Sequence, residues 1–186
     1  MRLGIFIGSF NPPHLGHLDM MNYLLDKKIV DKICVVPTGS YWDKNNLIDI
    51  SERIDMLKFY ENDNIFVDSI NNNYQYTYQL MRRLSEIYKN DQLYLVIGAD
   101  NIINFDKWKN YEELLKYSII VMNRDNVDIL KYVSNFNGKF TVISDYSFID
   151  ISSTKIRCDI YLYKKYLDDR VFKYIIDNKL YGGSYE

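Results

Sequence analysis

The sequence lacks the features of several protein classes. Its two cysteines, Cys34 and Cys158, lie far apart and in no pattern of a disulfide framework or a metal knuckle, so we expect a reducing compartment. No run reaches the roughly 20 apolar residues of a membrane span. The apolar start of the chain ends at Phe10, which is too short for the core of a signal peptide. The sequence therefore predicts a cytoplasmic protein with no membrane partner.

The chain also lacks an excess of charge of either sign. Lys and Arg total 23, Asp and Glu total 25, and the net charge is −2. This balance offers no basic excess to neutralise nucleic-acid phosphates. The chain shows no linker or low-complexity tract, and its 47% hydrophobic content is ordinary for a folded protein. A length of 186 residues suits one full-sized domain, so we expect a single domain over residues 1–186.

Aromatic residues are abundant, since Tyr, Phe and Trp make up 16% of the chain. Composition alone leaves open whether these rings form the core, a platform for a ligand or both. Such rings can stack on nucleic-acid bases, but the chain lacks the excess of positive charge that nucleic-acid binding favours.

Short apolar runs recur along the chain at intervals long enough to hold a helix. Such runs fit strands that are buried on both faces, and they lie at residues 3–7, 33–36, 65–67, 93–97, 119–122 and 140–143. Apolar residues spaced three and four apart predict helices at residues 17–26, 51–60, 77–88 and 168–180. The alternation predicts an α/β fold, a doubly wound, mostly parallel sheet with helices on both faces. Ligands bind such sheets beyond the carboxyl ends of the strands.

The segment after the first expected strand holds the only two histidines of the chain, His14 and His17. Their spacing places both near the start of the following helix, where free N–H groups favour phosphate. A structural role for these histidines and half of a metal site remain alternatives. Metal binding would need more ligands than the nearby Asp19. Neither the Walker A motif nor the dinucleotide-binding glycine fingerprint is present.

Two motifs resemble those of the nucleotidyltransferase superfamily that carries His-x-Gly-His on a Rossmann-like fold. The first motif is Gly8-Ser9-Phe10-Asn11-Pro12-Pro13-His14-Leu15-Gly16-His17, and the second is Ile151-Ser152-Ser153-Thr154-Lys155-Ile156-Arg157. Taken alone, the second would fit a plain Ser/Thr helix cap. The middle of the chain is most similar to the bacterial nicotinate-nucleotide adenylyltransferases. The segments that carry this similarity are Tyr76-Thr77, the run at residues 93–101, Phe105-Asp106-Lys107-Trp108 and the run at residues 119–124.

The resemblance implies a single nucleotidyltransferase domain that moves an adenylyl group from ATP to the phosphate of a pyridine mononucleotide. Mg²⁺ would accompany ATP and would need few protein ligands, so no metal site built from side chains is expected. By this resemblance His14, His17 and Arg157 are catalytic. The expected ATP-binding residues are Gly8, Ser9, Phe10, Gly98, Ile151, Ser152, Ser153 and Thr154.

On the acceptor side, the resemblance implies roles for Lys44, Thr77, Asp100 and Trp108. Trp108 occupies the position whose ring stacks on the pyridine, with core packing as the alternative. Several neighbouring residues depart from the family pattern, among them Lys109 after the tryptophan and Gln79-Leu80 after the threonine. Nicotinamide mononucleotide or phosphopantetheine as acceptor, and a catalytically silent nucleotide-binding module, therefore remain alternatives. The sequence leaves homo-oligomerisation open.

Overall fold

The computed structural model describes residues 1–39, 47–124 and 126–182. Within these residues, six strands form one sheet in which every neighbouring pair is parallel, in the order β3-β2-β1-β4-β5-β6. The strands are β1 (Arg2–Gly8), β2 (Lys32–Pro37), β3 (Ile65–Val67), β4 (Gln92–Gly98), β5 (Ser118–Met122) and β6 (Lys139–Ile143). Each lies on one of the apolar runs of the sequence, so the predicted α/β sheet is confirmed.

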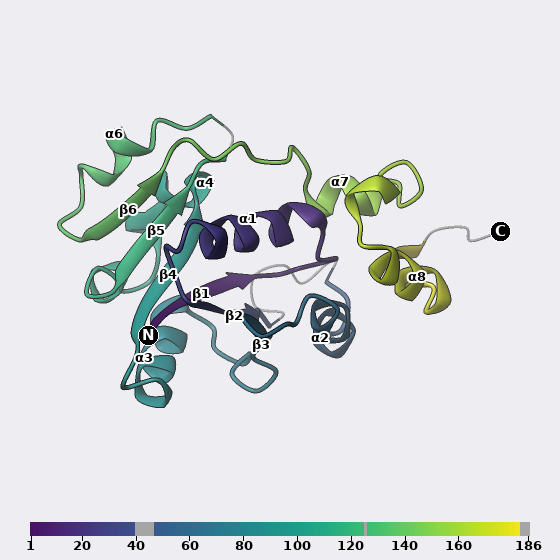
Figure 1. The fold of residues 1–186 in the computed structure, drawn as a ribbon, viewed down its shortest axis with the longest axis horizontal. Coiled ribbons are helices and arrows are strands. Elements are labelled where there is room, and N and C mark those ends of the chain that lie inside the picture. The colour runs from purple at the N-terminus through teal and green to yellow at the C-terminus, as the bar shows by residue number, and fades with distance from the viewer. Residues whose placement is uncertain (40–46, 125, 183–186) are drawn as a thin grey trace.

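Helices fill the intervals between the strands (Figure 1). They are α1 (Leu15–Asp26), α2 (Ile50–Lys58), α3 (Thr77–Ile87), α4 (Ala99–Ile102), α5 (Tyr111–Leu114), α6 (Ile129–Val133), α7 (Ser153–Cys158) and α8 (Asp169–Asp177). Single 3-10 turns lie at η1 (Phe105–Lys107) and η2 (Lys164–Tyr166). The last helix ends at Asp177, earlier than the periodicity suggests, because Asn178 caps it and Lys179 takes a positive φ of 53°.

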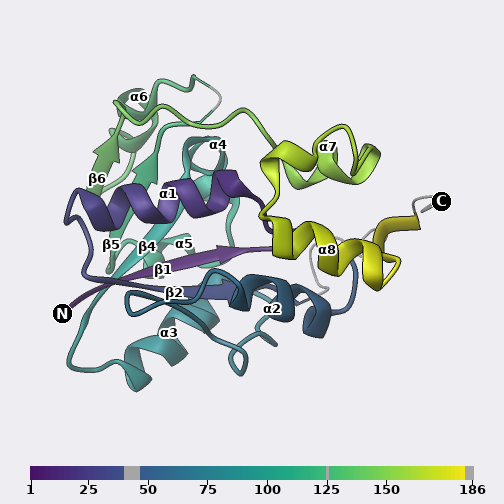
Figure 2. The same cartoon turned by 45° about the vertical axis from the view of Figure 1, so that its right-hand side comes forward.

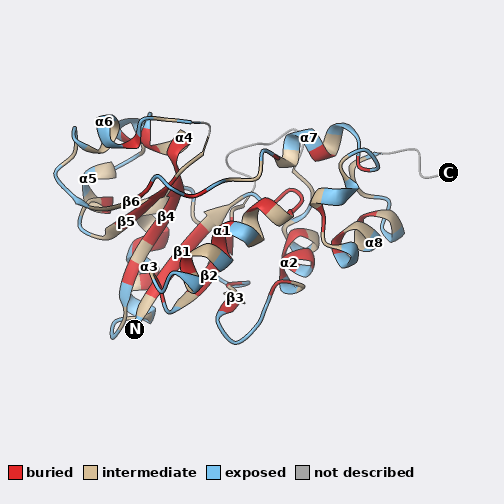
Figure 3. Cartoon of the chain, turned by 45° about the horizontal axis from the view of Figure 1, so that its top comes forward, coloured by how far each residue is buried: buried red, intermediate tan, exposed pale blue. Residues whose placement is uncertain are grey.

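The helices divide between the two faces of the sheet, so the fold is doubly wound (Figure 2). Apolar side chains of α1 and α2 pack with one face, where Phe6, Val35 and Val96 point, and those of α7 and α8 extend the same core beyond the end of β1. Those of α3, α4, α5 and α6 pack with the other face, where Ile5, Val36 and Leu95 point. Buried residues line the central strands and the inner sides of the helices in Figure 3. Alternate strand residues therefore supply two cores, as expected for a sheet covered on both faces.

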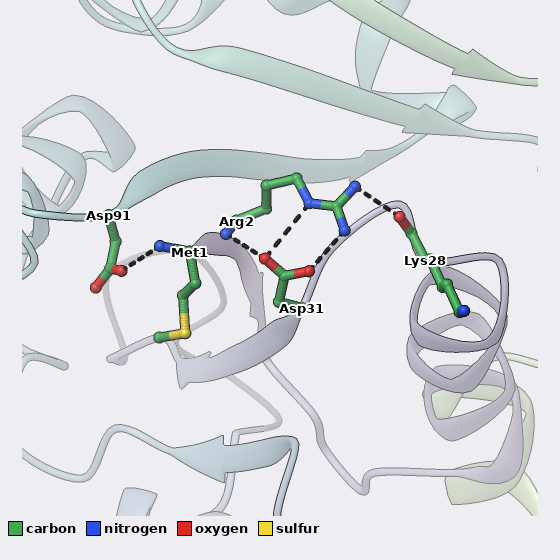
Figure 4. A network of polar contacts seen from close by, with 5 residues as sticks. All are labelled: Met1, Arg2, Lys28, Asp31 and Asp91. Atoms are coloured by element: carbon green, nitrogen blue, oxygen red, sulfur yellow. Dashed lines mark hydrogen bonds and ion pairs between the residues drawn. The ribbon is translucent and has the colours of Figure 1, made fainter.

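A network of polar contacts ties the start of β1 to its neighbours (Figure 4). The Met1 ammonium pairs with Asp91 at 2.8 Å. Arg2 donates to Asp31 at 2.6 Å and to the Lys28 carbonyl at 2.7 Å. These contacts lie at the end of the strands opposite to the site described below. They position the amino ends of the central strands.

The strand order reverses between β1 and β4, because the chain moves from β1 to one edge of the sheet and returns to the other side of β1 at β4. The crevice beyond the carboxyl ends of these two strands is where such folds bind ligands. In Figures 1 and 2, α7 and α8 lie beyond the carboxyl end of β1. Among the described residues, no helix is long and apolar enough to cross a membrane.

Candidate active site

A cavity of about 570 Å³ opens beyond β1 and β4, at the point where the strand order reverses. Its volume is within the range of small-molecule sites. Most of the residues that the sequence singles out line it: Gly8, Ser9, Phe10, His14, His17, Thr77, Gly98, Trp108, Ser152, Ser153, Thr154 and Arg157. Residues from five separate segments therefore meet in one place. Lys44 lies outside the described residues.

His14 and His17 form a stacked pair at the start of α1. Their ring centroids are 3.7 Å apart with an interplanar angle of 23°. The backbone N–H of His14, the N-cap residue of α1, donates to Nδ1 of His17 at 3.1 Å. A neutral imidazole that accepts at Nδ1 carries its proton on Nε2. His17 is therefore held as a tautomer with an Nε2–H donor.

The surroundings of the pair favour neutral imidazoles. Burial, together with the positive charge of Arg124, lowers the pKa of His14 to about 3. Burial also lowers the pKa of His17 well below its ordinary value, as do the charges of His14 and Arg124. His14 is 4% exposed, and its Nδ1 atom has no hydrogen-bond partner among the described residues. This nitrogen faces the first turn of α1, where the His14 side chain and the His17 backbone form part of a capping box, and the residue also lines the cavity.

The loop between β1 and α1 packs closely around the histidines. Phe10 has a positive φ of 49°, an uncommon conformation for a bulky residue, and its ring contacts His17 at a centroid distance of 4.9 Å. A Cβ on Gly16 would lie 3.0 Å from the His14 ring and 3.1 Å from Cγ2 of Ile151. A larger residue at this point of α1 would therefore press on His14 and Ile151.

The second motif holds the first in place. The Ser153 hydroxyl donates to the Pro12 carbonyl at 2.8 Å, and Arg157 Nη1 donates to the Asn11 carbonyl at 2.8 Å. Ser152 is the N-cap residue of α7, where its hydroxyl accepts from the Lys155 N–H at 3.2 Å. The plain helix cap that the sequence offered as an alternative is thus present. Ser152 combines this cap with a place at the cavity, because it also lines the cavity.

The other wall of the cavity carries the residues expected on the acceptor side. Trp108 lines the cavity and also contacts Phe105 at a centroid distance of 5.4 Å, so it has both a packing partner and an open side. Thr77 is the first residue of α3. Asp100 does not line the cavity itself. Its carboxylate lies over Gly98, where a Cβ would be 2.5 Å from Oδ1, and Asn101 lines the cavity in its place.

Ile151 is also absent from the main cavity. It lines a neighbouring cavity of about 240 Å³, which shares Arg124 and Ser152 with the first. Arg124 follows β5 and lines both cavities, and the sequence reasoning missed it as a site residue. Its place just after a strand is the signal that could have identified it.

The described residues offer a set of donors rather than a metal cage. No group of three or more His, Cys, Asp and Glu side chains that could hold a metal ion is found among them. Imidazoles, hydroxyls and a guanidinium line the cavity instead. This combination is suited to a polyphosphate.

Comparison with known proteins gives a consistent result. The cytidylyltransferase-like family model matches residues 5–159. Similar chains named "Probable nicotinate-nucleotide adenylyltransferase" include those of Borreliella burgdorferi, 36% identical over 97% of each chain, and Acholeplasma laidlawii, 34% identical over 95% of this chain and 96% of that one. Another, from Fusobacterium nucleatum, is 34% identical over 84% of this chain and 86% of that one.

Solved structures share the fold. Plasmodium falciparum nicotinic acid mononucleotide adenylyltransferase complexed with NaAD aligns with a TM-score of 0.81 over 100% of this chain and 99% of that one, at 23% identity. The structure named "a Putative Nicotinate-nucleotide Adenylyltransferase from Vibrio parahaemolyticus" aligns with a TM-score of 0.61 over 92% of this chain and 96% of that one, at 21% identity. At these identities the likeness concerns the fold alone.

Proposed function

We propose that the chain joins ATP to nicotinate mononucleotide, giving deamido-NAD and pyrophosphate. The chain belongs to the cytidylyltransferase-like family and, within it, to the nicotinate-nucleotide adenylyltransferases. The observation that carries this proposal is the meeting of both motifs, with Thr77 and Trp108, around one cavity at the switch point of the sheet. The reaction belongs to NAD biosynthesis. Residues 1–186 act as one nucleotidyltransferase domain, since α7 and α8 share a core with α1 and α2.

In this reaction a phosphate oxygen of the acceptor attacks the α-phosphorus of ATP. The bond between that phosphorus and the oxygen that bridges it to the β-phosphate breaks, and pyrophosphate leaves with the electron pair. The acceptor oxygen is already ionised, so the reaction needs no general base. The protein holds two anions that repel each other in line and stabilises the charge on the transferred and leaving groups.

We assign the phosphates of ATP to the wall formed by the two motifs. His17 would donate from Nε2, which its contact with the His14 N–H supports. His14, which also lines the cavity, would add a second imidazole, and Arg157 and Thr154 would reach the outer phosphates. Gly8, Ser9 and Phe10 allow the backbone to approach the nucleotide, and Ser152 and Ser153 add hydroxyls at the start of α7. Arg124 would add positive charge.

We assign the pyridine nucleotide to the opposite wall. The open side of Trp108 supports stacking on the pyridine ring, and Thr77 would offer a hydroxyl at the start of α3. Asn101, beside Asp100, is the polar group best placed at the cavity to meet a ribose or a phosphate of either substrate. We also assign a phosphate contact to Lys44, because the sequence resemblance implies it.

Magnesium is the divalent ion that we expect with ATP. The donor set fits this expectation, because Mg²⁺ keeps several waters and binds mainly through substrate phosphates when few carboxylates are near. When bound, the ion would neutralise phosphate charge. The two free cysteines, one buried and one exposed, are suited to a reducing compartment. This supports a cytoplasmic location.

The test is an assay of the purified chain with ATP and magnesium, offered nicotinate mononucleotide, nicotinamide mononucleotide and phosphopantetheine in turn. Pyrophosphate release should require an acceptor and be fastest with nicotinate mononucleotide, with deamido-NAD formed in equal amount. Turnover only with phosphopantetheine would contradict the pyridine acceptor. Binding of ATP without release under every condition would identify a silent nucleotide-binding module.

A further inference from the structure

Arg53 is a charged side chain in the interior of the molecule. It lies on α2 and is 1% exposed, so it is buried like the apolar residues Ile54, Met56 and Leu57 of the same helix. Arginine is rarely buried to this degree unless it is paired. Among the described residues, its hydrogen bonds go to backbone carbonyls and none to a carboxylate. Its position thus calls for an explanation other than an ion pair.

The guanidinium of Arg53 joins three separate backbone segments. Nη1 donates to the Ser9 carbonyl and to the Thr38 carbonyl, both at 2.7 Å, and Nε donates to the Ile48 carbonyl at 3.2 Å. Ser9 follows β1, Thr38 follows β2, and Ile48 lies just before α2. The planar fork of an arginine is suited to several acceptors with fixed directions.

Each of these segments is also attached to the first motif. The Thr38 N–H donates to the Gly8 carbonyl at 2.8 Å, and the Ile48 N–H donates to Oδ1 of Asn11 at 3.4 Å. Three carbonyl dipoles therefore point at one place behind the loop that carries Gly8, Ser9 and Phe10. Without a donor there, these part-buried carbonyls would lose a hydrogen-bond partner and would repel one another.

We propose that Arg53 is a positioning residue for the nucleotide site: it fixes the backbone of residues 8–11 from behind, so that this loop presents a set shape to the phosphates of ATP. The proposal rests on the proposed function for the identity of the ligand. Arg53 does not line the cavity, whereas Ser9, Asn11 and Thr38 do. It acts on the substrate through these residues and makes no contact of its own.

Two variants separate the geometry of Arg53 from its charge. Arg53→Lys keeps the positive charge and loses the planar fork, so it cannot meet three carbonyls in the same directions. Arg53→Met removes the charge and keeps most of the apolar volume. Lys58→Met is the matched control, since it removes an exposed cation from the same helix.

Hydrogen–deuterium exchange tests the structural half of the proposal without any substrate. In both Arg53 variants, exchange in peptides covering residues 5–11 and 36–39 should be at least about tenfold faster than in the wild type, because the segments open locally. Exchange in β5 and α3 should be unchanged, as it should be everywhere in Lys58→Met. Unchanged exchange around residues 5–11 in Arg53→Lys would overturn the proposal.

Kinetics test the functional half. In Arg53→Lys, kcat/KM for ATP should fall by about tenfold to a hundredfold, the usual cost of misplacing a binding group. The affinity for the pyridine mononucleotide alone should change less than threefold. A Lys variant with normal kcat/KM for ATP would overturn the proposal, as would equal losses for both substrates. A wild-type chain without turnover would contradict the proposed function instead, and the exchange data would still decide whether Arg53 holds the loop.

Discussion

His17 is the side chain on which the proposed chemistry depends most. Its Nδ1 atom accepts from the His14 N–H, which fixes the proton on Nε2. Replacing it by alanine removes one donor to the transferring phosphates. Turnover should fall by about a hundredfold to a thousandfold, the typical cost of removing one preorganised donor to developing charge. Steady-state pyrophosphate release measures the effect.

Stability provides the control for this variant. His17 is half-buried, and the truncation removes its ring contacts with Phe6, Phe10 and His14 and the hydrogen bond that it accepts from the His14 N–H. Chemical denaturation should therefore show a far smaller change than the loss of turnover. Near-wild-type turnover in His17→Ala would remove this residue from the mechanism.

His14 gives the folded state a dependence on pH. Its pKa is about 3 in the folded protein and near 6.5 in the unfolded chain, because burial disfavours the charged ring. The unfolded chain binds more protons below pH 6.5, so stability is full above that pH and falls as the pH drops toward 3. Between pH 7 and pH 5 this histidine should cost about 2 kcal/mol of unfolding free energy.

Urea denaturation of wild type and His14→Gln at these two pH values measures that contribution. The difference in unfolding free energy between the two pH values should be smaller in the variant, by about the contribution of one such histidine. An equal loss in both proteins would show that His14 is not held neutral.

Residues that follow a strand or open a helix could be predicted from the sequence, and those behind the site could not. His14, His17 and Thr77 meet at the cavity as their positions after a strand or at a helix start indicate, and Trp108, which follows η1, meets them there as the family resemblance implies. Arg53 could not be assigned, because its partners are carbonyls of residues that are distant in the sequence. An arginine within an apolar stripe was the only available signal.

At the scale of elements, the approach of α1 to the segment before α7 depends on Gly16. A methyl group there would press on the His14 ring and on Ile151. In Gly16→Ala the helix itself should gain, because alanine is the better helix former. The displaced histidine should nevertheless lower kcat/KM for ATP by about tenfold to a hundredfold.

Gly4→Ala is the matched control for this substitution. A Cβ on Gly4 would lie 3.4 to 3.5 Å from Val30 and Ile33, which is ordinary contact. The control should keep near-normal kinetics. Equal activity in both alanine variants would show that the tight packing at Gly16 does not position His14.

The strands and long helices were predictable, and the short helices were not. The central strands are buried on both faces and so appear as continuous apolar runs, as in β5 with the sequence Ser-Ile-Ile-Val-Met. The helices α4, α5 and α6 are four or five residues long. Such lengths are too short to show a helical period, and tertiary contacts with the second core decide them.

At the scale of the whole molecule, the site draws on both halves of the fold. The first motif follows β1, Asn101 and Trp108 follow β4, and α7 contacts the first motif through Ser153 and Arg157. Occupying the cavity should therefore stabilise the entire fold. At ATP concentrations about 100 times Kd, the unfolding free energy should rise by about 2.7 kcal/mol.

Thermal unfolding with increasing ATP measures this coupling, and magnesium without nucleotide is the control. The melting temperature should rise with the logarithm of ATP concentration once Kd is exceeded. A melting temperature that does not respond to ATP would show that the cavity is not a nucleotide site.

The most direct test of the account follows the atoms of the acceptor phosphate. Nicotinate mononucleotide whose phosphate carries a heavy oxygen isotope is incubated with ATP, magnesium and the chain, and the products are weighed by mass spectrometry. Direct attack on the α-phosphorus predicts deamido-NAD that retains all of the label and pyrophosphate that contains none. Label in the pyrophosphate, or no dinucleotide at all, would contradict adenylyl transfer at this site.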